Sequence, residues 1–72
     1  MSQFIKPFDE RLKEYYNLIR RVRDIHKKGL DERNSYRFYI YLDSLEPLIE
    51  HVTKRYKMNV PQDIIDIIDA YG

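Results

Sequence analysis

The side chains that could do chemistry are few and far apart. The chain has 72 residues, no Cys and two His, and its Ser residues are Ser2, Ser35 and Ser44. His51 follows Glu50 directly, but neighbouring helical residues diverge by about 100°, so the two cannot form a catalytic pair. Without Cys or an HExxH spacing, no zinc site is indicated. We therefore expect no enzyme activity, catalytic residue, metal ion, cofactor or small-molecule substrate.

Two further groups of polar residues have a structural explanation. Asp63, Asp66 and Asp69 recur at every third residue and could form a surface for a cation or a basic partner. Carboxylates on one helix face cannot surround a cation as a loop does, which favours a solvated face. His26 falls on an apolar stripe, where we expect a boundary residue beside Phe38 rather than a ligand.

Length and composition indicate one small helical domain over residues 1–72. The formal net charge is +1, and the longest apolar run covers residues 38–42, far short of the roughly 20 residues of a membrane helix. The N-terminal residues carry charges where a signal peptide would need an apolar region. We expect a cytoplasmic protein with no membrane contact. Chains this short often depend on association.

The first element is predicted as a helix from about Pro7 to Lys28. Apolar residues recur along it at spacings of four and three, which is typical of a helix packed along another helix. Pro7 suits a first helical turn, and Gly29 is suited to the left-handed conformation that ends a helix. The stripe consists of Phe8, Leu12, Tyr15, Ile19, Val22 and His26.

The second element contains the densest apolar and aromatic stretch of the chain, residues 36–56. The same spacing predicts a helix from Glu32, with Asp31 as N-cap, to about Lys57. A short connection would make it the antiparallel partner of the first helix. Its stripe consists of Phe38, Leu42, Leu45, Ile49, Val52 and Tyr56.

Pro47 leaves two alternatives for this second element. Proline inside a helix typically costs about 3 kcal/mol or produces a kink. Ser44 could cap a new helix with Pro47 in its first turn, where the missing N–H is harmless. Alternatively, one long helix could carry Pro47 on its outward face and bend around the core.

A third, amphipathic helix is predicted from Pro61 to about Tyr71. We expect it to fill a groove on the hairpin and to climb from the level of Tyr56 to about Leu45. It would then cover part of the groove and leave the remainder open. The groove residues are Leu18, Ile25, Tyr41 and Leu48.

The predicted fold is all-α: an antiparallel helical hairpin plus a short third helix, self-associating into a bundle. Residues 36–42 are apolar or aromatic around the whole helix except at Arg37, and such a helix is expected to be buried on all sides. We therefore predict a non-enzymatic interaction module. The hairpin tip, residues 25–42, would contact a second copy, giving a homodimer, or another protein. The predicted interface residues are Ile25, Tyr36, Phe38, Tyr39, Ile40 and Tyr41.

Basic residues near the tip suggest a nucleic-acid contact as an alternative. Lys and Arg could bind phosphates while Tyr side chains stack on bases. The near-neutral total charge argues against a dedicated nucleic-acid binder. The candidate residues are Arg20, Arg21, Arg23, Lys27, Lys28, Arg33 and Arg37.

As a β-strand, residues 36–42 would place successive side chains on opposite faces, and their Tyr, Phe and Ile content favours a strand. A strand followed by two helices over residues 36–71 resembles the ribbon-helix-helix arrangement. This resemblance implies a dimeric DNA-binding regulator whose paired strands enter the major groove. The residues facing the bases would be Arg37, Tyr39 and Tyr41.

Overall fold

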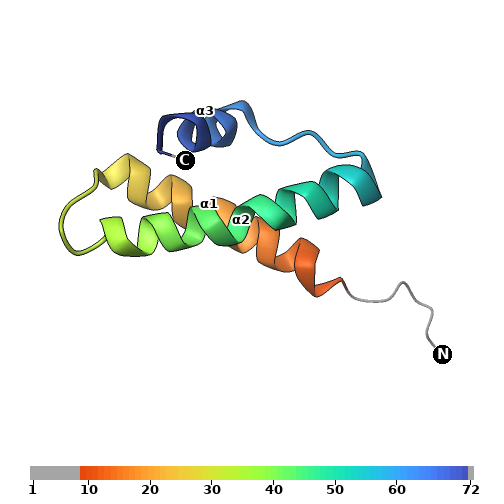
Figure 1. The fold of residues 1–72 in the computed structure, drawn as a ribbon, viewed down its shortest axis with the longest axis horizontal. Coiled ribbons are helices and arrows are strands. Elements are labelled where there is room, and N and C mark those ends of the chain that lie inside the picture. The colour runs from red at the N-terminus through yellow and green to blue at the C-terminus, as the bar shows by residue number, and fades with distance from the viewer. Residues whose placement is uncertain (1–8, 72) are drawn as a thin grey trace.

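The computed structural model describes residues 9–71, which form three helices and, within that range, no strand. Helix α1 spans Glu10–Lys28, α2 spans Ser35–Tyr56 and α3 spans Gln62–Tyr71. Figure 1 shows α1 and α2 as an antiparallel hairpin, with α3 lying across one side of it. The prediction of an all-α hairpin with a short third helix is confirmed.

Both ends of α1 are capped by the residue types that favour helix ends. The Asp9 carboxylate accepts hydrogen bonds from two backbone N–H groups of the first turn, at 3.0 and 3.3 Å. Gly29 has φ 96°, and its N–H bonds to a carbonyl oxygen of the last turn at 2.9 Å. The predicted end at Gly29 is confirmed, but its ψ of 142° differs from the left-handed helical conformation that was predicted for it. Pro7 and Phe8, which were predicted to begin the helix, lie outside the described residues.

The loop between α1 and α2 makes the second helix begin later than predicted. The Asp31 carboxylate accepts from the N–H groups of Arg33 and Asn34 at 2.8 and 2.9 Å. The Asn34 side chain accepts from the Asp31 N–H at 2.8 Å and donates to the Gly29 carbonyl at 3.1 Å. Side chains of this type stabilise turns by bonding to nearby backbone. Asp31 therefore holds the turn, and α2 begins at Ser35.

Helix α2 continues through Pro47, which lies on its exposed face. Both alternatives to a single long helix are wrong: Ser44 begins no new helix, and residues 36–42 form no strand. The helical spacing places Phe38, Leu42 and Leu45 together in the core, whereas a lone strand would have no partner to pair with. The ribbon-helix-helix resemblance is wrong for the same reason.

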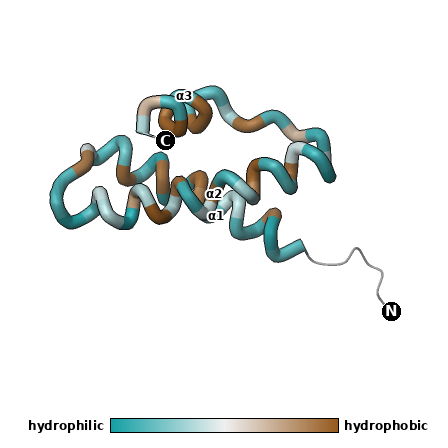
Figure 2. Tube along the Cα trace, viewed as in Figure 1, coloured by the Kyte–Doolittle hydropathy of each residue, from teal (hydrophilic) through white to brown (hydrophobic). Residues whose placement is uncertain are grey.

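The core contains residues of all three helices, and no polar or charged residue within 9–71 is buried in it. Figure 2 shows hydrophobic residues alternating with hydrophilic ones along each helix. The predicted stripes are confirmed in their middle parts, while His26 and Tyr56 at their ends are exposed. The buried residues are Tyr15, Leu18, Ile19, Val22, Phe38, Leu42, Leu45, Val52, Ile64 and Ile67.

Helix α3 occupies the opposite side of the hairpin from the predicted groove. Its residues line clefts with Arg23 and His26 of α1 and with Glu46 and Ile49 of α2. An ion pair with Arg23 stabilises this position. The prediction that α3 enters this groove and covers Leu18 and Leu48 is therefore wrong, whereas Ile25 and Tyr41 are left uncovered by α3, as expected.

Helix α3 also extends further towards the tip than predicted. The Tyr71 ring lies 5.1 Å from that of Phe38, centroid to centroid, well beyond the predicted limit at Leu45. Residues 57–61 are not helical, and Figure 1 shows them running back over the hairpin before α3 begins. Extended chain advances about 3.3 Å per residue, more than twice the rise of a helix, so α3 starts closer to the tip.

Candidate contact surface at the hairpin tip

Tyr36 and Ile40 form an exposed ridge on the outer face of α2, which we call the outer ridge. They lie one helical turn apart, and 73% and 42% of their respective surfaces are exposed. Neither is among the partly buried residues that pack against the core. Exposed apolar groups that adjoin one another on a rigid helix are typical of a contact site. Of the predicted interface residues, Tyr36 and Ile40 are thus exposed on this face, and Tyr39, which is 47% exposed, lies on the side of α3.

Phe38 and Tyr39 lie instead on the side of α3. Phe38 is fully buried, and the Tyr71 ring packs edge-on against it. Tyr71 also lies 6.5 Å from Tyr39 and 6.1 Å from His26, between ring centroids. Phe38 is thus a core residue that a partner cannot reach in the folded chain. Sequence spacing missed this cluster because its central residue, Tyr71, comes from the far end of the chain.

Ile25 and Tyr41 lie together in a cleft of about 270 Å³ on the side away from α3, which we call the tip cleft. The guanidinium carbon of Arg21 is 5.8 Å from the Tyr41 ring centroid, within the range of a cation–π interaction. This contact joins α1 to α2 across the cleft. The lining residues are Arg21, Asp24, Ile25, Lys28, Asn34, Arg37 and Tyr41.

The seven basic residues proposed for nucleic-acid contact do not form one continuous surface. Three line the tip cleft: Arg21, Lys28 and Arg37. Two line the cleft beside α3, on the other side of the hairpin: Arg23 and Lys27. Arg20 and Arg33 are exposed outside both clefts. A straight nucleic-acid backbone could therefore contact only some of them at once.

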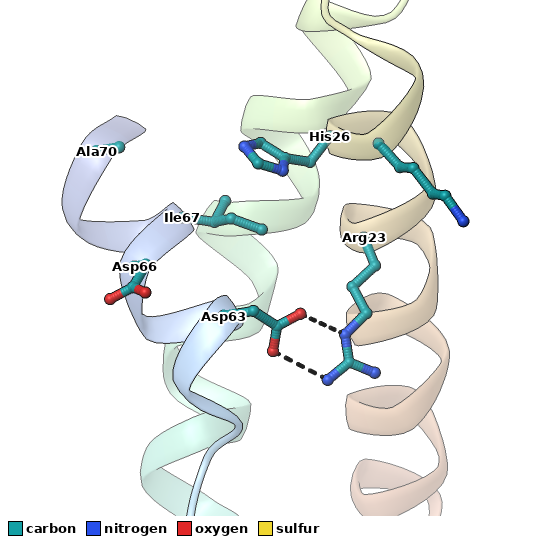
Figure 3. Close-up of a pocket in the computed structure, with 7 residues that line it drawn as sticks. Arg23, His26, Asp63, Asp66, Ile67 and Ala70 are labelled. Carbon is teal, nitrogen blue, oxygen red and sulfur yellow. Dashed lines mark hydrogen bonds and ion pairs between the residues drawn. The ribbon is translucent and has the colours of Figure 1, made fainter.

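Figure 3 shows the cleft beside α3, where Arg23 holds Asp63 through two hydrogen bonds. The Arg23 Nε and Nη2 atoms donate to the two Asp63 carboxylate oxygens at 2.7 and 3.0 Å. Arg23 lowers the pKa of Asp63, and the pair in turn raises the pKa of Arg23. Both side chains are about half exposed, so the pair contributes at most about 1 kcal/mol. It joins α1 to the start of α3 on this side of the hairpin.

The remaining polar residues of this cleft suggest no metal site. Asp66 accepts a hydrogen bond from the Gln62 amide at 3.0 Å. His26 is exposed and points its ring towards the cleft in Figure 3. Among residues 9–71, no group of three or more acidic, His or Cys side chains is placed to hold a metal ion.

At the open end of the hairpin, Asp9, His51 and Tyr56 form a cluster that sequence reasoning missed. The His51 Nε2 lies 3.1 Å from an Asp9 carboxylate oxygen, which also accepts a short hydrogen bond from the Tyr56 hydroxyl. The Tyr56 hydrogen bond, followed by that of His51, lowers the pKa of Asp9, and Asp9 raises the pKa of Tyr56. Glu50 instead pairs with Lys54 at 3.3 Å. The cluster ties the start of α1 to the end of α2.

Replacing Tyr56 by Phe should change how stability depends on pH at both extremes. The lowered pKa of Asp9 means that its contribution is complete above the ordinary value of 3.8 and is lost as the pH falls further. The raised pKa of Tyr56 means that its contribution is complete below 10.0 and is lost as the pH rises above that value. We expect the stability difference between wild type and Tyr56→Phe to be constant near neutrality and to shrink at both ends.

Urea unfolding from about pH 2 to pH 11 would measure this difference. Tyr36→Phe is the matched control, because it removes an exposed hydroxyl that forms no hydrogen bond within residues 9–71. That variant should follow the wild type at every pH. A Tyr56→Phe difference that stays constant over the whole range would show that the cluster does not form in solution.

Comparison with known proteins found no similar protein. No protein-family model, curated protein or solved structure matches the chain. Among residues 9–71, no helix is long and apolar enough to cross a membrane. Residues 9–71 thus define a three-helix, all-α protein.

Proposed function

We propose that the protein is a non-enzymatic interaction module that self-associates through the outer ridge of α2. The observation that carries the proposal is the exposure of Tyr36 and Ile40, one turn apart, on a helix whose opposite face is fully packed. A short chain gains stability from association, because it buries a limited share of its own surface. Pairing of two outer ridges would remove both side chains from water. The expected product is a symmetric homodimer.

Measuring mass in solution with an Ile40→Glu variant would test this proposal. We expect the wild type to change from monomer to dimer between about 10 μM and about 1 mM. Ile40→Glu should weaken dimerisation by at least about tenfold, because it buries a charge in an apolar contact. Asn59→Glu introduces the same charge at an exposed position away from the tip and should dimerise normally. A wild-type monomer at every concentration, or an unchanged Ile40→Glu dimer, would refute self-association.

Nucleic-acid binding at the tip cleft is a second candidate function. It is favoured by the three basic side chains of Arg21, Lys28 and Arg37 around the partly exposed Tyr41 ring. Its test is binding to labelled random-sequence duplex and single-stranded DNA at about 50 and about 200 mM salt. A protein that neutralises several phosphates should lose affinity by orders of magnitude over this range. Absence of binding at the lower salt would eliminate this function.

A further inference from the structure

Helix α3 shows what kind of helix the hairpin can bind along its side. Two of its apolar residues, Ile64 and Ile67, are buried against the hairpin. An acidic residue at its start, Asp63, is held by two hydrogen bonds from Arg23 of α1. Apolar residues thus provide the packing, and one carboxylate facing an arginine fixes the position. This is how an amphipathic helix docks into a groove.

The tip cleft presents the same combination of groups on the opposite side, where α3 does not reach. Ile25 and Tyr41 are partly buried and pack against the core from the two helices, and Leu48 does so two turns further along α2. Arg21 and Arg37 flank this apolar strip, one from each helix. Within residues 9–71, Arg37 has no hydrogen bond, ion pair or ring contact.

The charged residues that line the tip cleft favour a partner with negative charge. Its lining contains three basic residues and one acidic residue, Asp24, and Asp24 already faces Lys28 at 3.4 Å. An acidic group docked between Arg21 and Arg37 would meet two cations that no carboxylate within residues 9–71 neutralises. Complementary charge of this kind speeds association and discriminates against basic partners.

We propose that the tip cleft binds an acidic amphipathic helix from another protein. Apolar residues of that helix, spaced by three and four, would pack on Ile25 and Tyr41, with carboxylates towards Arg21 and Arg37. A second copy of α3 is a poor occupant, because its apolar residues are already buried in its own fold. The proposal rests on the proposed function in treating the tip as a contact surface, but it uses different residues from the outer ridge.

Two designed peptides of about 20 residues test this proposal with the full chain. Both peptides have Leu at alternating spacings of three and four, which gives one apolar face. The opposite, polar face carries Glu in one peptide and Lys in the other, and the remaining positions are Ala. Binding is followed by fluorescence anisotropy at about 50 and about 300 mM salt. We expect the Glu peptide to bind at least about tenfold more tightly than the Lys peptide, and more weakly at the higher salt.

Variants locate the binding to the cleft. Arg37→Glu and Ile25→Asp should each weaken binding of the Glu peptide by about tenfold or more. The control Arg20→Glu reverses an exposed charge outside the cleft and should leave binding unchanged. Because Ile25 packs against the core, circular dichroism would check that its variant is folded, and Arg37→Glu keeps the test decisive if it is not.

Each result supports or overturns the inference. Equal binding of the two peptides, no binding at about 1 mM, or unchanged binding by Arg37→Glu would overturn it. DNA that binds with a steep salt dependence and displaces the peptide would assign the cleft to nucleic acid instead. Ile40→Glu should bind the Glu peptide normally while failing to dimerise. Failure of the helix proposal is thereby distinguished from failure of self-association.

Discussion

Replacing Phe38 by Ala should lower the free energy of unfolding by about 3 to 5 kcal/mol, the usual range for removing a buried aromatic ring. Phe38 is fully buried near the tip of the hairpin, and Tyr71 of α3 packs against its ring. The substitution would leave a cavity beneath α3 and remove the contact that holds its last turn. A domain of this size has little stability to spare, so the variant should unfold at a much lower urea concentration than the wild type.

Urea denaturation followed by circular dichroism would measure the effect, with ligand-free protein at a concentration where the wild type is monomeric. Tyr36→Ala provides the control, because it removes an aromatic ring two residues away that is 73% exposed. Its effect should stay within about 0.5 kcal/mol. Equal losses for the two variants would contradict the assignment of Phe38 to the core and of Tyr36 to the outer ridge.

Replacing Pro47 by Ala should raise the free energy of unfolding by about 1 to 3 kcal/mol, in contrast to the loss expected for Phe38→Ala. Pro47 lies inside α2 and is exposed, so its removal creates no cavity. Alanine restores the missing backbone N–H and relieves the crowding of the preceding turn. Proline is about 3 kcal/mol less favourable than alanine within a helix. The same urea titration would measure the gain.

Ser44→Ala is the matched control for Pro47→Ala, because it also changes an exposed residue of α2. In the continuous helix, Ser44 caps nothing, and its replacement should change stability by less than about 0.5 kcal/mol. If a helix began at Ser44, that replacement would cost about 1 kcal/mol, and Pro47→Ala would be nearly neutral. This second pattern of results would contradict a continuous α2 in solution.

The helices could be predicted because their signals are local. The spacing of the apolar residues and the position of Gly29 act within a few turns of the backbone, and the structure bears both out. Asp31 shows where local signals conflict. Its carboxylate can cap a helix or hold a turn, and reciprocal bonds with Asn34 favour the turn. The start of α2 therefore depended on a competition that residue type alone does not resolve.

The candidate surface was predicted only in part, because the exposure of a side chain depends on which other helix packs over it. Residues 36–42 are apolar or aromatic apart from Arg37, yet Phe38 is buried beside Tyr71 of α3 while Tyr36 and Ile40 remain exposed. The Asp9, His51 and Tyr56 cluster gave no signal, since Asp9 lies more than 40 residues from the other two in the chain. Such contacts exist only after the hairpin has closed.

What the sequence by itself determined is the set of helices and their apolar faces, since both follow from backbone sterics and residue spacing. It did not determine which side of the hairpin α3 would occupy, because the apolar pattern pointed to the groove of Ile25 and Tyr41 and α3 lies on the other side. Tertiary structure decided this, through the burial of Ile64 and Ile67 and the packing of Tyr71 against Phe38, with the Arg23–Asp63 ion pair beside them. These contacts join residues distant in sequence. The placement of α3 closes one side of the hairpin and leaves the tip cleft and the outer ridge as its free surfaces.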